Sequence, residues 1–180
     1  MPTYITLLRG INMAGHKIIK MDKLRQCFET LKFKNVRTYI QSGNVLFESS
    51  QSKQDKLTST IEKGLQVFLG HEIKVFIRTI KEFEEIAGAK AFKNITTHLD
   101  SKMFVTFLTE SVKPKPKVPL WSNKRDVEVL EVAKREFFSL SHEVYGRFGF
   151  PNLFIEKTFK VPATTRNWRT INKLVEFANK

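Results

Sequence analysis

Side chains that could bind an anion are concentrated in two short segments of the N-terminal half. Arginine and lysine supply positive charge there, while amides, an imidazole and a hydroxyl supply hydrogen bonds. The candidates are Arg9, Asn12, His16, Lys17, Gln41, Ser42 and Asn44. No carboxylate pair, Ser-His-Asp set or phosphate-binding glycine loop accompanies them. The residues therefore favour binding of a small anionic or nucleotide-like ligand, and they leave open whether the protein is an enzyme.

A further candidate, Arg166, lies in the run Thr164-Thr165-Arg166-Asn167-Trp168. If a helix begins in this run, its free amides and its dipole favour an anion, and Arg166 adds a fork of donors. The alternative is structural. Thr164 or Thr165 then caps the helix, Trp168 anchors it in the core, and Arg166 forms an ion pair.

The sequence contains no metal-binding or cofactor-binding motif. Cys27 is the single cysteine, and the four histidines, His16, His71, His98 and His142, show no ligand spacing. We therefore expect no metal site and no cofactor. Cys27 falls in the apolar stripe of a predicted helix, which favours a small core residue over a nucleophile.

The elements that position these residues follow the order β-α-β-β-α-β. Alternating apolar and polar residues predict strands at 3–10, 36–40, 45–47 and 73–78. Apolar residues at helical spacing predict one helix over 21–31 and another that begins at Ser52 and ends near Gly70. This order is that of a ferredoxin-like unit.

The predicted topology brings the candidate segments to one edge of the sheet. The end of the first strand, the turn between the second and third strands, and the start of the fourth strand all meet there. Gly43 gives this turn, residues 41–44, the positive φ that a tight reversal needs. A structural interpretation is also open, because Asn12, Ser42 and Asn44 are good turn residues that can simply hold the loops together.

The second half of the chain predicts a separate α+β unit. Residues 79–82 form a capping box that begins a short helix ending near Gly88. We assign residues 1–88 to the ferredoxin-like unit and residues 89–180 to a second, diverged ferredoxin-like α+β unit packed on the first. Its strands are predicted at 103–109, 127–132, 136–140 and 143–148, and its helices at 153–159 and from Thr164 or Thr165 onward.

The chain is strongly basic, with a net charge of +13 from 31 Lys and Arg against 18 Asp and Glu. This charge suggests an anionic partner, but it is spread evenly over both halves and predicts weak, non-specific binding to nucleic acid. The alternative functions are a nucleic-acid-binding module that uses the basic surface and an enzyme with an unrecognised active site. For the first of these, the sheet face opposite the helices is a second surface to weigh, because aromatic and basic residues on an open sheet can stack bases. That face is predicted to carry Thr6, Leu8, Arg37, Tyr39, Leu46, Lys74, Phe76 and Arg78. Burial of this face beneath the second half is the favoured interpretation.

We do not expect the N-terminal residues to form a signal peptide, because Arg9 interrupts the apolar stretch too early. No segment has the length and apolarity of a membrane span. We therefore expect a cytoplasmic protein without a membrane partner.

Three motifs together resemble a bacterial family of proteins. They are LRGIN (residues 8–12) followed by GHK (15–17), RTYIQSGNV (37–45) and ATTRNW (163–168). The sequence is identified as similar to the domain-of-unknown-function family numbered sixteen ninety-seven. This resemblance implies a cytosolic α+β protein of ferredoxin-like units, with no established activity, cofactor or partner.

The sequence departs from the family pattern at two positions. Ala14 stands where the family usually has the first glycine of a pair, which weakens a close approach of that loop to a ligand. Lys32 stands where a glycine usually follows the first helix, which argues against a left-handed helix end at that point.

Overall fold

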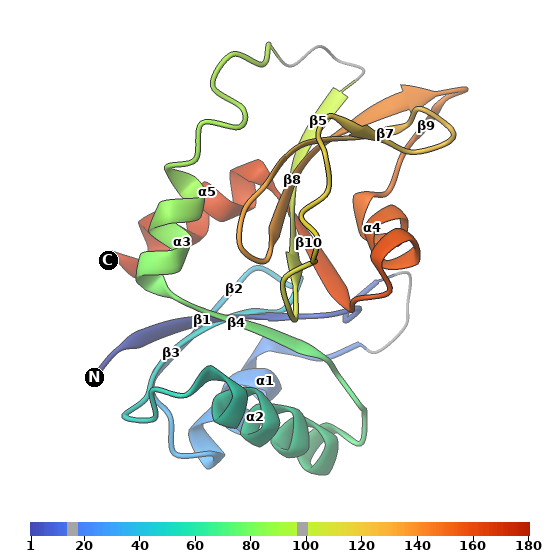
Figure 1. The fold of residues 1–180 in the computed structure, drawn as a ribbon. Helices are drawn as coiled ribbons and strands as arrows, with labels where there is room; N and C mark the ends of the chain where they lie inside the picture. The colour runs from blue at the N-terminus through green and yellow to red at the C-terminus, as the bar shows by residue number, and fades with distance from the viewer. Residues whose placement is uncertain (14–17, 97–100) are drawn as a thin grey trace. The chain divides into compact units, whose positions relative to one another are not determined.

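The computed structural model describes residues 1–13, 18–96 and 101–180 of the chain. These residues form five helices and two antiparallel sheets, an α+β fold (Figure 1). Among the described residues, no helix is both long and apolar enough to cross a membrane.

The chain divides into two compact units. The first consists of Met1–Ala87 together with Leu174–Lys180, and the second of Gly88–Lys173. The sequence placed all of residues 89–180 in the second unit, whereas Leu174–Lys180 belongs to the first.

The first unit contains the predicted β-α-β-β-α-β order, followed by one further helix. Its elements are β1 (Thr3–Leu8), α1 (Met21–Thr30), β2 (Lys34–Tyr39), β3 (Asn44–Glu48), α2 (Gln54–Leu69), β4 (Val75–Thr79) and α3 (Ile80–Ala87). The strands lie in the order β2-β3-β1-β4, and every neighbouring pair is antiparallel. Helix α3 begins with the predicted capping box, in which Glu82 accepts the Thr79 amide at 2.7 Å and the Thr79 hydroxyl accepts the Glu82 amide at 3.2 Å.

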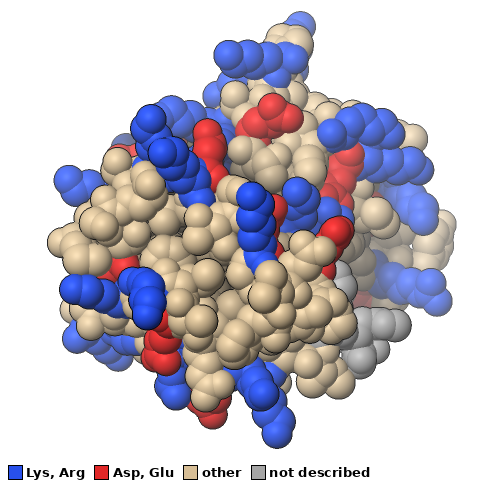
Figure 2. Space-filling view, turned by 90° about the horizontal axis from the view of Figure 1, so that it is seen from below, with Lys and Arg blue, Asp and Glu red and all other residues tan. Residues whose placement is uncertain are grey.

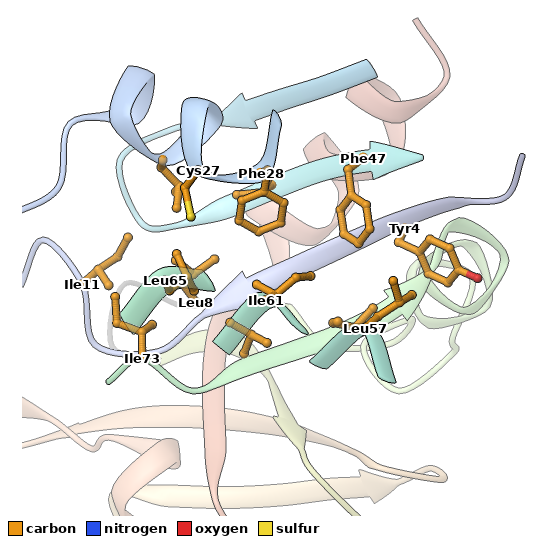
Figure 3. Packing of buried hydrophobic residues seen from close by; sticks show 14 of the residues in the cluster. Tyr4, Leu8, Ile11, Cys27, Phe28, Phe47, Leu57, Ile61, Leu65 and Ile73 are labelled. Atoms are coloured by element: carbon orange, nitrogen blue, oxygen red, sulfur yellow. The ribbon is translucent and has the colours of Figure 1, made fainter. Parts of the chain in front are cut away.

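Helices α1 and α2 bury one face of this sheet and form the main core of the unit (Figure 3). The ring of Phe28 packs on that of Phe47, with 5.5 Å between their centroids, and Leu65 and Cys27 lie in the same cluster. Cys27 is 1% exposed, and burial raises the pKa of its thiol to about 11. The prediction that Cys27 is a core residue is therefore confirmed.

The opposite face of the sheet is also buried, but the prediction assigned the wrong residues of β1 to it. Ile5 pairs with Leu46 and Arg78 in register, so Ile5 and its alternate neighbours occupy this face. Leu8 instead packs in the core with α1 and α2. Thr6, two residues earlier in the strand, lies on the same face as Leu8. Both sides of the β1 sequence carry aliphatic residues, so alternation alone could not decide which side faced the helices.

The last turn of the C-terminal helix belongs to the first unit through its contacts with β2. Arg37 donates from Nη1 to the carbonyl oxygen of Phe177 at 3.1 Å, and its guanidinium lies over the Phe177 ring. The ring of Tyr39 packs on Phe177 with 5.3 Å between centroids. The Arg37 hydrogen bonds satisfy carbonyl groups that a helix end otherwise leaves without partners.

The second unit is α+β, as predicted, but it is built mainly on one sheet. Its elements are β5 (Ser101–Leu108), β6 (Leu120–Trp121), β7 (Val127–Val132), β8 (Glu136–Val144), β9 (Arg147–Phe148), α4 (Pro151–Phe159), β10 (Ala163–Asn167) and the start of α5 (Trp168–Ala178). The sheet order is β10-β5-β8-β7-β6, with β9 paired to β8. Five strands in succession precede its first helix, so a ferredoxin-like repeat is not confirmed.

The end of α1 differs from the expectation drawn from Lys32. Lys32 has a φ of 66°, which is the left-handed conformation usually given to glycine. The helix therefore ends in a left-handed residue despite the lysine side chain, at a cost of about 1–2 kcal/mol.

Candidate functional site

The three segments predicted to share one edge of the first sheet do meet there. The amide of Leu8, at the end of β1, donates to the carbonyl of Gly43 at 2.8 Å. The amide of Arg9 donates to the carbonyl of Lys74, just before β4, at 3.0 Å. We call residues 9–13 and 41–44, together with Lys74, the rim.

Gly43 brings the turn against the end of β1. Its φ is 77°, as the turn prediction required. A Cβ at this position would lie 2.6 Å from Cδ1 of Ile11 and 2.9 Å from Cβ of Leu8. Position 43 therefore requires glycine for two reasons: the positive φ of its backbone and the close approach of the two segments.

Asn44 holds the turn from within and does not face solvent. Its side chain is fully buried, and its Nδ2 donates to the carbonyl of Tyr39 at 3.0 Å and to the Ser42 hydroxyl at 2.9 Å. The amide donors are thus used inside the protein. Asn44 positions the turn and is a poor contact for a ligand.

Asn12 has a similar role in the preceding loop. Its Nδ2 donates to the carbonyls of Gln41 at 2.7 Å and Ile19 at 3.1 Å, and its Oδ1 accepts the Ile19 amide at 2.7 Å. One side chain therefore bonds both to the backbone of Ile19 and to the turn. The φ of Asn12, 53°, is one that asparagine tolerates better than most residues.

The polar groups at the surface of the rim come from a smaller set of residues. Gln41 is exposed, and Arg9 and Ser42 are half-buried. The exposed Lys74 lies 3.6 Å from a carboxylate oxygen of Glu62. The candidates His16 and Lys17 lie outside the described residues. The rim therefore offers cations and hydrogen-bonding groups on a backbone fixed by Asn12 and Asn44.

Arg166 lies in the second unit and is not part of the rim. It is on β10 rather than in the first turn of a helix, and it is 8% exposed. Its Nη1 donates to the Thr164 hydroxyl at 3.0 Å and to the carbonyl of Thr165 at 2.9 Å. Burial lowers the pKa of its guanidinium to about 10.

The predicted cap of the last helix is wrong. Thr164 and Thr165 pair with β5 in the sheet, and Asn167 caps α5 by accepting the Thr170 amide at 2.8 Å. The anion site proposed for Arg166 at a helix N-terminus loses its basis, because the residue precedes the helix and is buried.

A groove elsewhere on the first unit was not predicted. It is lined by the α1–β2 connection, the residues after β3 and the first half of α2, and its volume is about 370 Å³. We call it the Lys32 groove. No motif in the sequence indicated it.

The described residues contain no group of three or more His, Cys, Asp or Glu side chains that could hold a metal ion.

The fold is that of an α+β protein of two units, and in the first unit a loop and a turn are fixed beside Arg9. The chain belongs to the family described as "Protein of unknown function (DUF1697)". The model of this family matches residues 1–138. This confirms the family suggested by the three motifs.

One solved structure extends the likeness in fold over nearly the whole chain. It is the conserved bacterial protein SP0830 from Streptococcus pneumoniae, with a TM-score of 0.72 and 22% sequence identity over 97% of each chain. At this identity the likeness concerns the fold alone. No curated protein matches the chain.

Proposed function

We propose that the rim binds a small anionic or nucleotide-like ligand, and that Arg9, Gln41 and Ser42 contact it. Asn12 and Asn44 serve as positioning residues, because their amide donors bond within the protein. His16 and Lys17, which follow Asn12 in the sequence, remain candidate contacts on the sequence alone. Arg166 is not included.

One observation carries the proposal: hydrogen bonds fix three separate segments around Arg9. The Asn12 side chain joins its loop to the turn, and backbone bonds join Leu8 to Gly43 and Arg9 to Lys74. Binding residues are often held on loops that a rigid sheet positions, since a fixed site loses little entropy when it binds. The structural interpretation accounts for Asn12 and Asn44 themselves, and the proposal concerns Arg9, Gln41 and Ser42, which are half-buried or exposed beside them.

We also infer that the first unit is ferredoxin-like, on the strand order β2-β3-β1-β4 with α1 and α2 on one face. The same description of the second unit, and the cytoplasmic location, stay predictions. The fold does not specify a reaction, so an enzymatic activity is left open.

The alternative, a dedicated nucleic-acid-binding module, has less support. Leu46 and Phe76, on the sheet face that would stack bases, are 1% and 2% exposed. On the face shown in Figure 2, the basic side chains are dispersed and interspersed with acidic ones. We infer weak, non-specific binding to nucleic acid from the overall charge.

Nuclear magnetic resonance can test the proposed site directly. Adenosine monophosphate and inorganic phosphate are titrated into the ¹⁵N-labelled protein. We expect saturable shifts of the amides of Arg9, Gly43 and their neighbours in the rim. Shifts confined to another surface, or no saturation at millimolar concentrations, would contradict the proposal.

A further inference from the structure

The Lys32 groove has the size of a small-molecule site. Its volume of about 370 Å³ falls within the range of roughly 300–1,000 Å³ that is usual for ligand pockets. Its walls come from three segments that are distant in sequence, residues 31–34, 49–51 and the part of α2 that carries Leu57 and Thr60. Met1 completes the lining.

The apolar part of the groove is held in place by the core beneath it. Leu57 is 1% exposed and belongs to the cluster shown in Figure 3. The ring of Phe33 packs on Phe47 and Phe28, with centroid distances of 4.5 and 5.9 Å. Leu31 packs against the same cluster. The groove therefore presents a preformed apolar surface that suits a flat or aliphatic body.

Two lysines add positive charge to this apolar surface. Lys32 and Lys34 are both exposed and both line the groove. Across the described residues, neither ammonium group forms an ion pair. The nearest acidic neighbour in the strand register is Glu48, opposite Lys34. Lys34 thus faces one carboxylate across the strand pair, and Lys32 adds a second cation to the lining of the groove.

Lys32 itself ends α1 in the left-handed conformation, with a φ of 66°. Lys160 ends α4 in the same way, with a φ of 57°, so this conformation is how these helices end and is not by itself a mark of function. What Lys32 contributes to the groove is its exposed, cationic side chain.

We propose that the Lys32 groove binds a small molecule that carries an anionic group on a flat apolar body. The apolar wall of Leu31 and Phe33, with the buried Leu57 beneath it, receives the body, and Lys32 and Lys34 bind the anion. This site is separate from the rim. Thr3 pairs with Glu48 at the end of β1 near the groove, whereas Leu7 pairs with Asn44 at the end near the rim.

A matched pair of probes tests both parts of the proposal. Naphthalene-1-sulfonate carries the anion, and naphthalene-1-methanol has the same ring system without charge. Their affinities for the full chain are measured by titration monitored by nuclear magnetic resonance. We expect the sulfonate to bind about tenfold more tightly, as two partly exposed ion pairs would allow.

Three variants locate the binding. In the double variant Lys32→Gln, Lys34→Gln, sulfonate binding should weaken to the level of the alcohol. The control double variant Lys63→Gln, Lys81→Gln removes the same charge from exposed positions outside the groove and should leave both affinities unchanged. Thr60→Trp, at an exposed lining position, should fill the groove and abolish binding of both probes.

The proposal is overturned by any of three results. Equal affinity for the two probes would remove the role of the lysines. An equal loss in the control variant would assign the preference to the overall charge. Unchanged binding in Thr60→Trp would place the probes elsewhere. Because none of these variants alters the rim, the outcome is independent of anion binding by Arg9.

Discussion

Asn12 and Asn44 use short amide side chains to hold the backbone around Arg9. Asparagine combines two donors with an acceptor and tolerates a left-handed backbone, so one side chain can replace several missing backbone partners. Asn12 does so for Ile19 and Gln41, and Asn44 does so for Tyr39. The positions of these side chains, rather than their contact with a ligand, make the rim a fixed surface.

Replacement of Asn12 should therefore reduce stability. We expect Asn12→Ala to lower the free energy of unfolding by about 1–3 kcal/mol, because Ile19 and Gln41 lose their partners. The control is Gln41→Ala, in which the bonded carbonyl belongs to the backbone and remains; its cost should stay within about 0.5 kcal/mol. Urea denaturation measures both. Equal costs would show that Asn12 does not hold the loop.

Glu82 should make a contribution to stability that depends on pH. Burial alone would raise the pKa of this carboxyl, but hydrogen bonds from the Thr79 backbone, Gln54 and the Thr79 hydroxyl, with the charge of Arg78, outweigh it and lower the pKa. A lowered folded-state pKa stabilises the protein above the unfolded value of about 4.3, and this stabilisation is lost as the pH falls through the folded pKa.

The variant Glu82→Gln tests this contribution by denaturation at several pH values. It should be less stable than the wild type at pH 7, and the difference should shrink as the pH falls below about 4. The exposed Glu84 lies on the same helix, so Glu84→Gln is the control, with a small difference at every pH. A difference for Glu82→Gln that does not change with pH would assign its effect to packing.

Individual turn and core residues could be predicted where the determining contacts are local. The positive φ of Gly43, the capping box of Thr79 and Glu82, and the burial of Cys27 each follow from a few neighbouring residues. The partners of Asn12 could not be predicted in this way. They depend on where the chain returns at Ile19, which no local pattern specifies.

At the scale of elements, the first unit could be predicted because the apolar residues of most segments repeat at one spacing only, either that of a helix or that of a strand. Strand β1 is the exception. It has aliphatic residues on both sides, so the prediction assigned its residues to the wrong faces of the sheet. The start of α5 was misplaced because Thr164 and Thr165 satisfy the sequence rule for a cap. In the structure both are strand residues, a role that suits β-branched side chains equally well.

Asn167 should account for the stability of the first turn of α5. Its Oδ1 accepts the Thr170 amide, so Asn167→Ala should cost about 1 kcal/mol in the free energy of unfolding. The control, Arg169→Ala, changes an exposed residue of the same turn and should cost less than about 0.5 kcal/mol. Chemical denaturation measures the free energy of unfolding of both variants. An equal loss in the two would argue against Asn167 as the cap.

At the scale of the whole molecule, the return of the C-terminal turn to the first unit was not predictable. It depends on Arg37 and Tyr39 contacting Phe177, residues far apart in sequence that carry no pairing signal. The strand order of the second unit was likewise open, because short antiparallel strands can be arranged in several ways with the same apolar pattern.

The distributed charge predicts how the molecule should behave with nucleic acid. We expect weak binding of labelled single-stranded and duplex oligonucleotides that does not depend on sequence. The affinity should fall steeply between about 50 and 200 mM salt, because neutralised phosphates release counterions. Fluorescence anisotropy measures it. Submicromolar, sequence-dependent binding at physiological salt would favour the nucleic-acid module instead.

The central claim is that Arg9 contacts an anion at the rim, and that the rim folds without the Arg9 side chain. Calorimetric titration of adenosine monophosphate into the wild type, Arg9→Ala and the control Lys23→Ala, an exposed cation of α1, tests this claim most directly. We predict that Arg9→Ala alone weakens binding by about tenfold, as loss of one charged hydrogen-bond donor implies, while its Tm stays within about 2 °C of the wild type. Unchanged affinity together with a clear fall in Tm would contradict the account and make Arg9 a structural residue.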